Sequence, residues 1–306
     1  MNIRKTLLAA GFFVLVLAGC GGGDAAPPLP VPVPSPTAFL GELKHVQVGT
    51  VNYGYYRFGR GRPLVLINAF GMTTANWGAP LLRALGERYE VTAFDNRGMG
   101  HSPDTGPDFY TVEDMADSTV AFMAAIGLNK PDILGWSLGG ETALAIGVRH
   151  GNRVDRIISV AGDAGSPKTI PPTPEFMAVA AQPDPPLQDV LSILFPADQM
   201  DKAAAWVAGV AEMPANPSLA GGRNRQLAAF AAWSESTTIW DAIPTIRNPA
   251  LFINGTEDLS TPVENAVTLA SRLPGSWLMQ VTDAGHAVLF QEQERCLKMI
   301  DAFLAR

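Results

Sequence analysis

Ser137 lies between two glycines in the segment ILGWSLGGET, after an apolar run and before a series of good helix formers. The residues from Gly135 to Gly139 match the pattern G-x-S-x-G, in which a strained strand-to-helix turn exposes the serine hydroxyl. Such a hydroxyl can attack a carbonyl carbon when a base removes its proton. The alternative is an ordinary junction with a capping serine. The strand and helix predicted on either side favour the nucleophile.

A serine nucleophile needs a base, and the chain contains four histidines. Three have positions that favour surface roles: His45 in a predicted edge strand, His101 in the loop GMGHSP, and His150 at the end of a predicted helix. His286 instead follows the predicted strand 277–281, in the loop TDAGHA. Because the carboxyl ends of parallel strands meet at one edge of a sheet, where sites form, His286 is the predicted base.

The base in turn needs an acid that fixes the tautomer of its ring. Asp258 follows the predicted strand 250–253 in INGTEDLSTP and is the favoured candidate. Asp163, in AGDAG after another predicted strand, is its rival. Asp283 is too close to His286 in the sequence to be the usual partner, although it could lie behind the site.

Alternating strands and helices must hold these side chains in place. Strands are predicted at 46–48, 51–55, 64–67, 90–94, 132–135, 156–161, 250–253 and 277–281, and helices at 77–85, 112–126, 138–150, 263–273 and 293–304. Continuous apolar runs such as LVLI indicate strands buried on both faces. The alternation predicts an α/β protein with a mostly parallel sheet covered by helices on both sides.

Residues 166–245 interrupt this alternation. The segment contains helix-like pieces separated by many prolines and no strand pattern. We therefore expect a core of residues 39–165 and 246–306, with residues 166–245 forming a helical cap over the sheet.

The order Ser137, Asp258, His286 resembles the α/β-hydrolase family, and the likeness covers about residues 40–306. The run DNRGMGHS at 95–102 and the segment NGTEDLSTP also resemble family motifs. The resemblance implies an eight-stranded sheet with a cap inserted after the sixth strand.

By position, the resemblance also makes the backbone N–H groups of Phe70 and Leu138 the donors of an oxyanion hole. The family commonly has His-Gly after its third strand, whereas this chain has Asn68-Ala69. The hole uses backbone groups, so those two side chains are not required for it.

Composition narrows the classes of function. The 306 residues are 47% hydrophobic and 17% charged, so a large core is available. The formal charge is −7 and no basic block occurs, which argues against nucleic-acid binding. The chain shows neither a dinucleotide fingerprint nor a cluster of metal ligands, so no cofactor and no metal are expected. The sequence leaves the oligomeric state open.

The first 19 residues have the pattern of an export signal, with basic residues followed by a short apolar run. The sequence LAGC that ends at Cys20 resembles the lipobox of bacterial lipoproteins, in which the cysteine is lipidated. The alternative is a plain secretory signal. Residues 20–38 are rich in glycine and proline and are expected to form a tether. We therefore expect an exported lipoprotein of the cell envelope, anchored in a membrane through Cys20, with outer-membrane sorting indicated by Gly21 in a Gram-negative host.

The expected function is hydrolysis of a small or medium apolar carboxylic ester, or a lactone or thioester, through an acyl-enzyme. Trp136, beside the serine, is expected to line an apolar pocket together with aromatic residues of the cap. Two alternatives use the same three residues, namely a carbon–carbon bond hydrolase and a cofactor-free haloperoxidase. An alternative of another class is a non-catalytic binding lipoprotein on this scaffold.

Overall fold

The computed structural model describes residues 35, 37–217 and 220–306. The expected signal segment, Cys20 and most of the tether lie outside these residues. None of the helices that the structure describes is long and apolar enough to cross a membrane.

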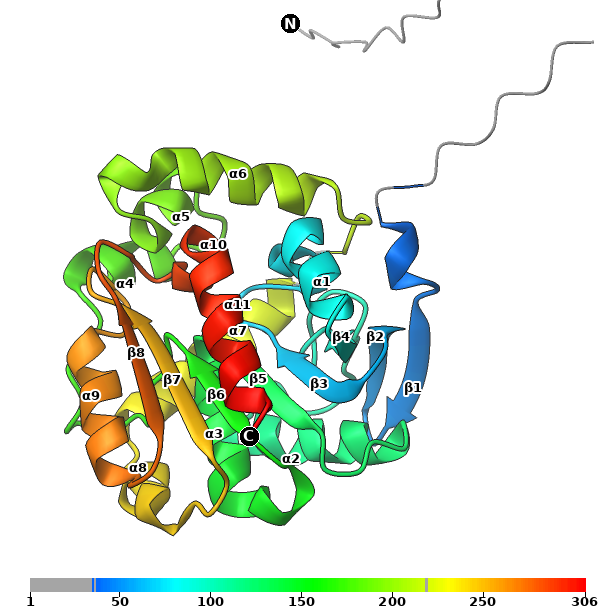
Figure 1. Cartoon of the computed structure of the whole chain (residues 1–306), viewed down its shortest axis with the longest axis horizontal. Coiled ribbons are helices and arrows are strands. Elements are labelled where there is room, and N and C mark those ends of the chain that lie inside the picture. Colours follow the sequence, from blue (N-terminus) through cyan, green and yellow to red (C-terminus); the bar gives the residue numbers. More distant parts are fainter. Residues whose placement is uncertain (1–34, 36, 218–219) are drawn as a thin grey trace, which may run out of the picture. The chain divides into compact units, whose positions relative to one another are not determined.

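Eight strands of the described chain form one sheet, in the order β1-β2-β4-β3-β5-β6-β7-β8 (Figure 1). They are β1 (Lys44–Val48), β2 (Val51–Gly59), β3 (Arg62–Ile67), β4 (Tyr89–Phe94), β5 (Asp132–Trp136), β6 (Ile157–Val160), β7 (Ala250–Gly255) and β8 (Trp277–Val281). β2 pairs antiparallel with β1 and with β4, and the remaining neighbours pair parallel. This confirms the predicted fold class, an α/β protein with a mostly parallel eight-stranded sheet.

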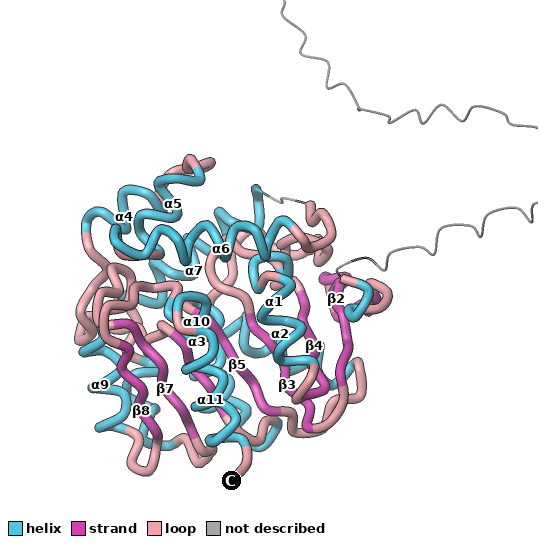
Figure 2. The backbone as a smooth tube through the Cα atoms, turned by 45° about the horizontal axis from the view of Figure 1, so that its top comes forward, coloured by secondary structure: helices cyan, strands magenta, loops and turns pink. Residues whose placement is uncertain are grey.

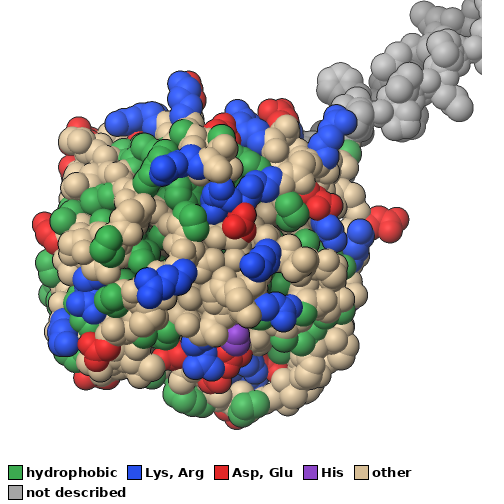
Figure 3. Space-filling model, turned by 60° about the horizontal axis from the view of Figure 1, so that its bottom comes forward, with side chains coloured by type: hydrophobic (Ala, Val, Ile, Leu, Met, Phe, Trp, Pro, Cys, Tyr) green, Lys and Arg blue, Asp and Glu red, His purple; other side chains and the backbone are tan. Residues whose placement is uncertain are grey.

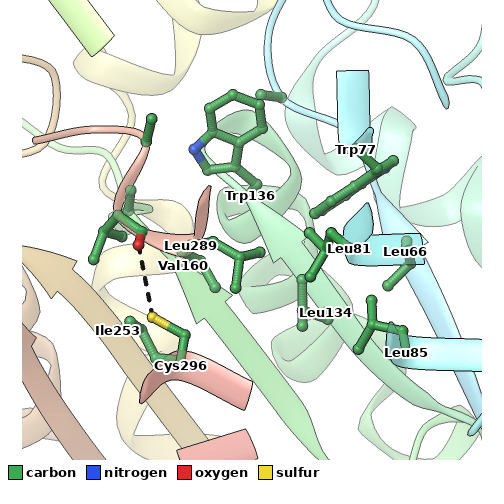
Figure 4. Packing of buried hydrophobic residues seen from close by; sticks show 14 of the residues in the cluster. Leu66, Trp77, Leu81, Leu85, Leu134, Trp136, Val160, Ile253, Leu289 and Cys296 are labelled. Carbon is green, nitrogen blue, oxygen red and sulfur yellow. Dashed lines mark hydrogen bonds between the residues drawn. The ribbon is translucent and has the colours of Figure 1, made fainter. Parts of the chain in front are cut away.

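One face of the sheet packs against α1 (Ala79–Gly86), α10 (Val288–Gln291) and α11 (Gln293–Leu304). Figure 4 shows this layer, in which leucines of α1 meet Leu66 and Leu134 of the strands. Cys296 of α11 is buried there, and its thiol donates to the Val288 carbonyl at 3.7 Å. Burial raises the pKa of this thiol to about 12, so the group stays protonated.

The other face packs against α2 (Val112–Ala125), α3 (Leu138–His150), α8 (Thr238–Ala242) and α9 (Val263–Arg272). The four apolar side chains at the end of β3, Leu64 to Ile67, are fully buried because they point alternately into the two layers. The continuous apolar strands that the sequence predicts therefore have a direct cause, since both faces of the sheet are covered.

The segment between β6 and β7 contains only helical elements among the described residues. They are α4 (Pro174–Ala180), α5 (Leu187–Leu194), α6 (Met200–Ala211), α7 (Ala220–Glu235), α8 and two short 3-10 helices, Ala197–Gln199 and Ile243–Thr245. In Figures 1 and 2, α4, α5 and α6 lie beyond one end of the strands. Helix α8 packs against α3 instead. The boundaries 166–245 of a separate cap remain a prediction.

The helix expected at 77–85 is wrong at its start. A 3-10 helix spans Thr74–Trp77, and the α-helix begins only at Ala79. Gly78 between them has φ 70°, a left-handed conformation that interrupts a right-handed helix. The apolar spacing of the sequence continues across this break, which is why the pattern alone did not reveal it. Besides this 3-10 helix and the two named above, the described chain has short 3-10 helices at Ala38–Leu40 and Gly151–Arg153.

Charged side chains of both signs are interspersed with hydrophobic ones on the face shown in Figure 3.

The turn from β5 to α3 depends on close backbone contacts. A Cβ atom on Gly135 would lie 1.9 Å from the carbonyl oxygen of Gly139. A Cβ atom on Gly139 would lie 2.0 Å from the carbonyl oxygen of Ile67 in β3. Real Cβ atoms never come this close to an oxygen, so both positions require glycine for α3 to pack where it does.

We expect Gly139→Ala to lower the free energy of unfolding by about 1–3 kcal/mol or more, because the new methyl group must push α3 away from β3. Gly221→Ala is the matched control, since a Cβ atom at that helical position meets nothing within 4 Å. Urea denaturation of both variants checks the expectation. Equal stability of the two variants would contradict it.

Candidate active site

Ser137 occupies the turn that joins β5 to α3. Its backbone has φ 56° and ψ −122°, a conformation that residues other than glycine rarely adopt. Its N–H donates to the Val160 carbonyl at 2.8 Å, which fixes the turn against β6. The residue is 7% exposed, and its Oγ lies 2.8 Å from Nε2 of His286. The hydroxyl therefore sits at the sheet edge with a ring nitrogen in hydrogen-bond contact.

His286 lies in the loop between β8 and α10, as expected from the sequence. Its Nδ1 lies 2.9 Å and 3.0 Å from the two carboxylate oxygens of Asp258. The ring packs beside the rings of Trp136 and Phe176, at centroid distances of 6.0 and 5.8 Å. The indole N–H of Trp136 also donates to the His286 carbonyl at 3.0 Å. Packing and hydrogen bonds together leave the imidazole little freedom to rotate.

Asp258 is held by the loop that follows β7. Its Oδ1 accepts the backbone N–H groups of Ser260 and Thr261 at 2.8 and 2.9 Å. These two hydrogen bonds fix the orientation of the carboxylate beside the imidazole. The S-T pair after Asp258 in the sequence is the signal from which this local support could have been read.

Asp163, the rival acid, has other partners. Its Oδ1 accepts the Gly165 N–H at 2.8 Å and the Trp233 indole N–H at 3.1 Å. Burial raises the pKa of Asp163, and the nearby charge of Asp258 acts in the same direction. Burial also raises the pKa of Glu141, on the first turn of α3, well above its usual value. The structure thus places Asp258 in hydrogen-bond contact with the imidazole. Asp163 instead lies in surroundings that favour the protonated, neutral carboxyl group.

The loop after β3 carries Phe70, the first expected oxyanion donor. The Asn68 side chain donates to the Phe94 carbonyl at 2.7 Å, and the Asn96 side chain donates to the Asn68 carbonyl at 3.0 Å. The backbone N–H of Gly71, the residue after Phe70, donates to Oε1 of Gln226 at 2.7 Å. Asn68 therefore anchors the loop to β4 where the family commonly has histidine.

Leu138, the second expected donor, is the first residue of α3. A residue at this position has no helical carbonyl four residues earlier to which its N–H can donate. Its N–H is therefore available to an anion, and the N-terminus of α3 favours negative charge there.

A cavity of about 290 Å³ opens above the serine. Trp136, Ser137 and His286 form its floor, and apolar side chains of α4, α5 and α6 form much of its wall. Arg223 of α7 lies at its edge, with its guanidinium 4.9 Å from the centre of the Phe70 ring. The expected pocket residue Trp136 is thus a lining residue, and Phe176 and Trp206 are as well.

The remaining candidates lie elsewhere. His45 is in β1, His101 donates its backbone N–H to Asp95, His150 contacts Asp117 through its ring, and Asp283 is exposed. Gln226 was not found by sequence reasoning, because an isolated glutamine in a proline-broken region carries no signal. In the described part of the chain, no group of three or more His, Cys, Asp or Glu side chains could hold a metal ion.

The arrangement of Ser137, His286 and Asp258 can perform acyl transfer. A hydroxyl in contact with an imidazole, itself oriented by a carboxylate, can lose its proton as it attacks a carbonyl carbon. The backbone N–H groups of Phe70 and Leu138 are the expected donors to the resulting oxyanion.

Residues 62–293 match the model of the α/β hydrolase fold family. A putative carbamate hydrolase, RutD, of Caulobacter vibrioides is 27% identical over 275 residues, covering 86% of this chain and 99% of that protein. The pimeloyl-[acyl-carrier protein] methyl ester esterase of Aeromonas hydrophila is 27% identical, covering 81% of this chain and 97% of the esterase.

Among solved structures, an α/β hydrolase fold protein from Chitinophaga pinensis superposes with a TM-score of 0.76 at 26% identity. The match covers 86% of this chain and 96% of that one. The match to the family model spans β3 to β8 and contains all three polar side chains described above. This chain belongs to the α/β-hydrolase fold family and is a hydrolytic enzyme.

Proposed function

We propose that this enzyme hydrolyses small or medium apolar carboxylic esters through an acyl-enzyme. The observation that carries the proposal is the continuous hydrogen-bonded series from Ser137 through His286 to Asp258, with distances of 2.8 and 2.9 Å. The proposal assigns Ser137 as nucleophile, His286 as general base and acid, and Asp258 as the group that orients the imidazole.

In the first half of the reaction, Oγ of Ser137 attacks the ester carbonyl while Nε2 of His286 accepts the hydroxyl proton. The N–H groups of Phe70 and Leu138 stabilise the oxyanion of the tetrahedral intermediate. His286 then donates its proton to the leaving oxygen, the carbon–oxygen bond breaks, and the alcohol departs. In the second half, His286 activates a water that releases the acid and regenerates the hydroxyl.

An apolar substrate is supported by the lining of the cavity. Most of the side chains around it are aliphatic or aromatic, and the ionisable side chains among the described lining residues are Asp184, Arg223 and His286. Both guanidinium amino groups already donate to the carbonyls of Ala180 and Gln182 at the end of α4. A panel of chromogenic esters, run on purified protein, tests the proposal.

The alternatives can be separated from esterase activity. A carbon–carbon bond hydrolase or a haloperoxidase on the same residues would react with a fluorophosphonate and leave the ester panel untouched. A non-catalytic binding protein would fail in both assays.

We also propose that the mature chain is an envelope lipoprotein, with Cys20 lipidated and residues 20–38 as a tether. The support is the LAGC sequence that ends the apolar segment. A tethered esterase would meet apolar esters near a membrane, where they concentrate.

Ser137→Ala should lower kcat by up to about 10⁶-fold, because no other hydroxyl of the described residues hydrogen-bonds to the imidazole. Fluorophosphonate labelling should disappear as well. Ser271→Ala is the control, since this exposed serine of α9 donates only to the Thr268 carbonyl. An alanine variant at 137 that retained most of its activity would refute the assignment.

Asp258→Asn should lower kcat by about 10⁴-fold, since the amide no longer fixes the required tautomer of His286. Asp163→Asn should have a small effect, because burial already favours the neutral form of that carboxyl. Measuring kcat of both variants on one ester distinguishes the two acids. The reverse ranking would move the orienting role to Asp163.

Cys20→Ala should move the protein from the membrane fraction to a soluble or unprocessed form. Each buried CH₂ of an acyl chain stabilises membrane association by ~0.8 kcal/mol, so two or more chains anchor firmly. Fractionation of cells that express each form measures the change. Normal processing with unchanged membrane partitioning would show that the cysteine is not the anchor.

A further inference from the structure

Two cavities of very different size meet at Ser137. The cavity described above has a volume of about 290 Å³, and a second one has about 20 Å³. Both are lined by Ser137, Phe70, Phe176 and Ala180, so they adjoin at the same residue. A substrate bonded to Oγ therefore has two unequal spaces available to its two ends.

The two cavities also differ in their access to the base. His286 lines the larger cavity, whereas the smaller one is lined by Leu138, Ser260 and apolar side chains of α4 and α7. Nε2 of His286 must come within hydrogen-bond distance of the leaving oxygen in order to protonate it. The leaving oxygen and the group attached to it therefore lie on the side of the larger cavity.

The stereochemistry of the tetrahedral intermediate assigns the rest. Its carbon carries Oγ of Ser137, the oxyanion, the leaving oxygen and the acyl substituent. With the leaving oxygen facing His286 in the larger cavity, the smaller cavity, which His286 does not line, is the space on the other side of the carbonyl carbon that can receive the acyl substituent. A cavity of about 20 Å³ holds one water-sized group such as a methyl.

We propose, on the basis of the esterase function proposed above, that the enzyme selects esters of short acids with larger apolar alcohols or phenols. The acetyl group is the acyl group that fits the smaller cavity. The larger cavity, at about 290 Å³, is close to the lower limit of the pockets that bind drug-sized ligands. Selectivity for a short acid and tolerance of the alcohol then have separate structural causes.

Met177 of α4 and Phe230 of α7 set the limit on acyl length. Both line the small cavity, and both also line a third cavity of about 350 Å³ that includes Asp163 and Trp233. These two side chains thus stand between a space for one methyl group and a much larger space behind it. Met177 is 37% exposed, so its truncation should leave the fold intact.

The first test measures kcat/KM for p-nitrophenyl esters from acetate to octanoate, and for acetates of alcohols of increasing size. We expect a loss of about 10-fold or more for each methylene added to the acyl chain beyond the first. The acetate series should vary far less. A flat or rising profile with acyl length would overturn the inference and leave the esterase function standing.

Met177→Ala and Phe230→Ala should each raise the ratio of butyrate to acetate kcat/KM by about 10-fold, because they join the small cavity to the space behind it. Val190→Ala is the matched control, since Val190 lines only the larger cavity of the two at Ser137. It should alter the alcohol preference and leave the acyl profile unchanged. Unchanged ratios in both cavity variants would overturn the role of these two residues.

The same panel separates this inference from the function on which it rests. Hydrolysis with the wrong acyl profile refutes the inference alone. No hydrolysis of any ester, together with no fluorophosphonate labelling, refutes the proposed function and the inference with it.

Discussion

The left-handed backbone at Ser137 is the constraint on which the rest of the site depends. A serine at φ 56° is strained by on the order of 1–3 kcal/mol, and it persists only where the surroundings determine it fully. Here the surroundings are β3, β5 and β6, which hold the turn through the bare backbones of Gly135 and Gly139 and through the Val160 carbonyl. The parallel sheet is thus what keeps the hydroxyl raised toward the imidazole.

Helix α7 contributes to the site through the loop after β3 and through the small cavity. Gln226 accepts the Gly71 N–H, and Arg223 stacks on Phe70, so one helix holds the loop that carries the proposed oxyanion donor. Phe230, one turn further along, closes the small cavity. Because these contacts share one rigid element, a shift of α7 would change substrate fit and oxyanion geometry together.

The sequence was sufficient for the parts of the site that follow directly from the sheet. Ser137, Asp258 and His286 each come after a recognisable strand, and parallel strands bring their carboxyl ends to one edge. The sequence did not predict the positions of Gln226 and Met177 at the site, because both act through contacts between segments far apart in the chain, which apolar spacing does not encode. It did not predict the helix break at Gly78 either, because the apolar spacing continues across the break.

The three reactive side chains also come from separate strands, and this has a consequence for folding kinetics. His286 follows β8, an edge strand that pairs only with β7. Helices form through local contacts and can appear early, whereas pairing of β6 with β7 must wait for the long segment 161–249 to close. Recovery of hydrolysis during refolding should therefore lag behind recovery of helical circular dichroism, because hydrolysis reports when β7 and β8 have joined the sheet.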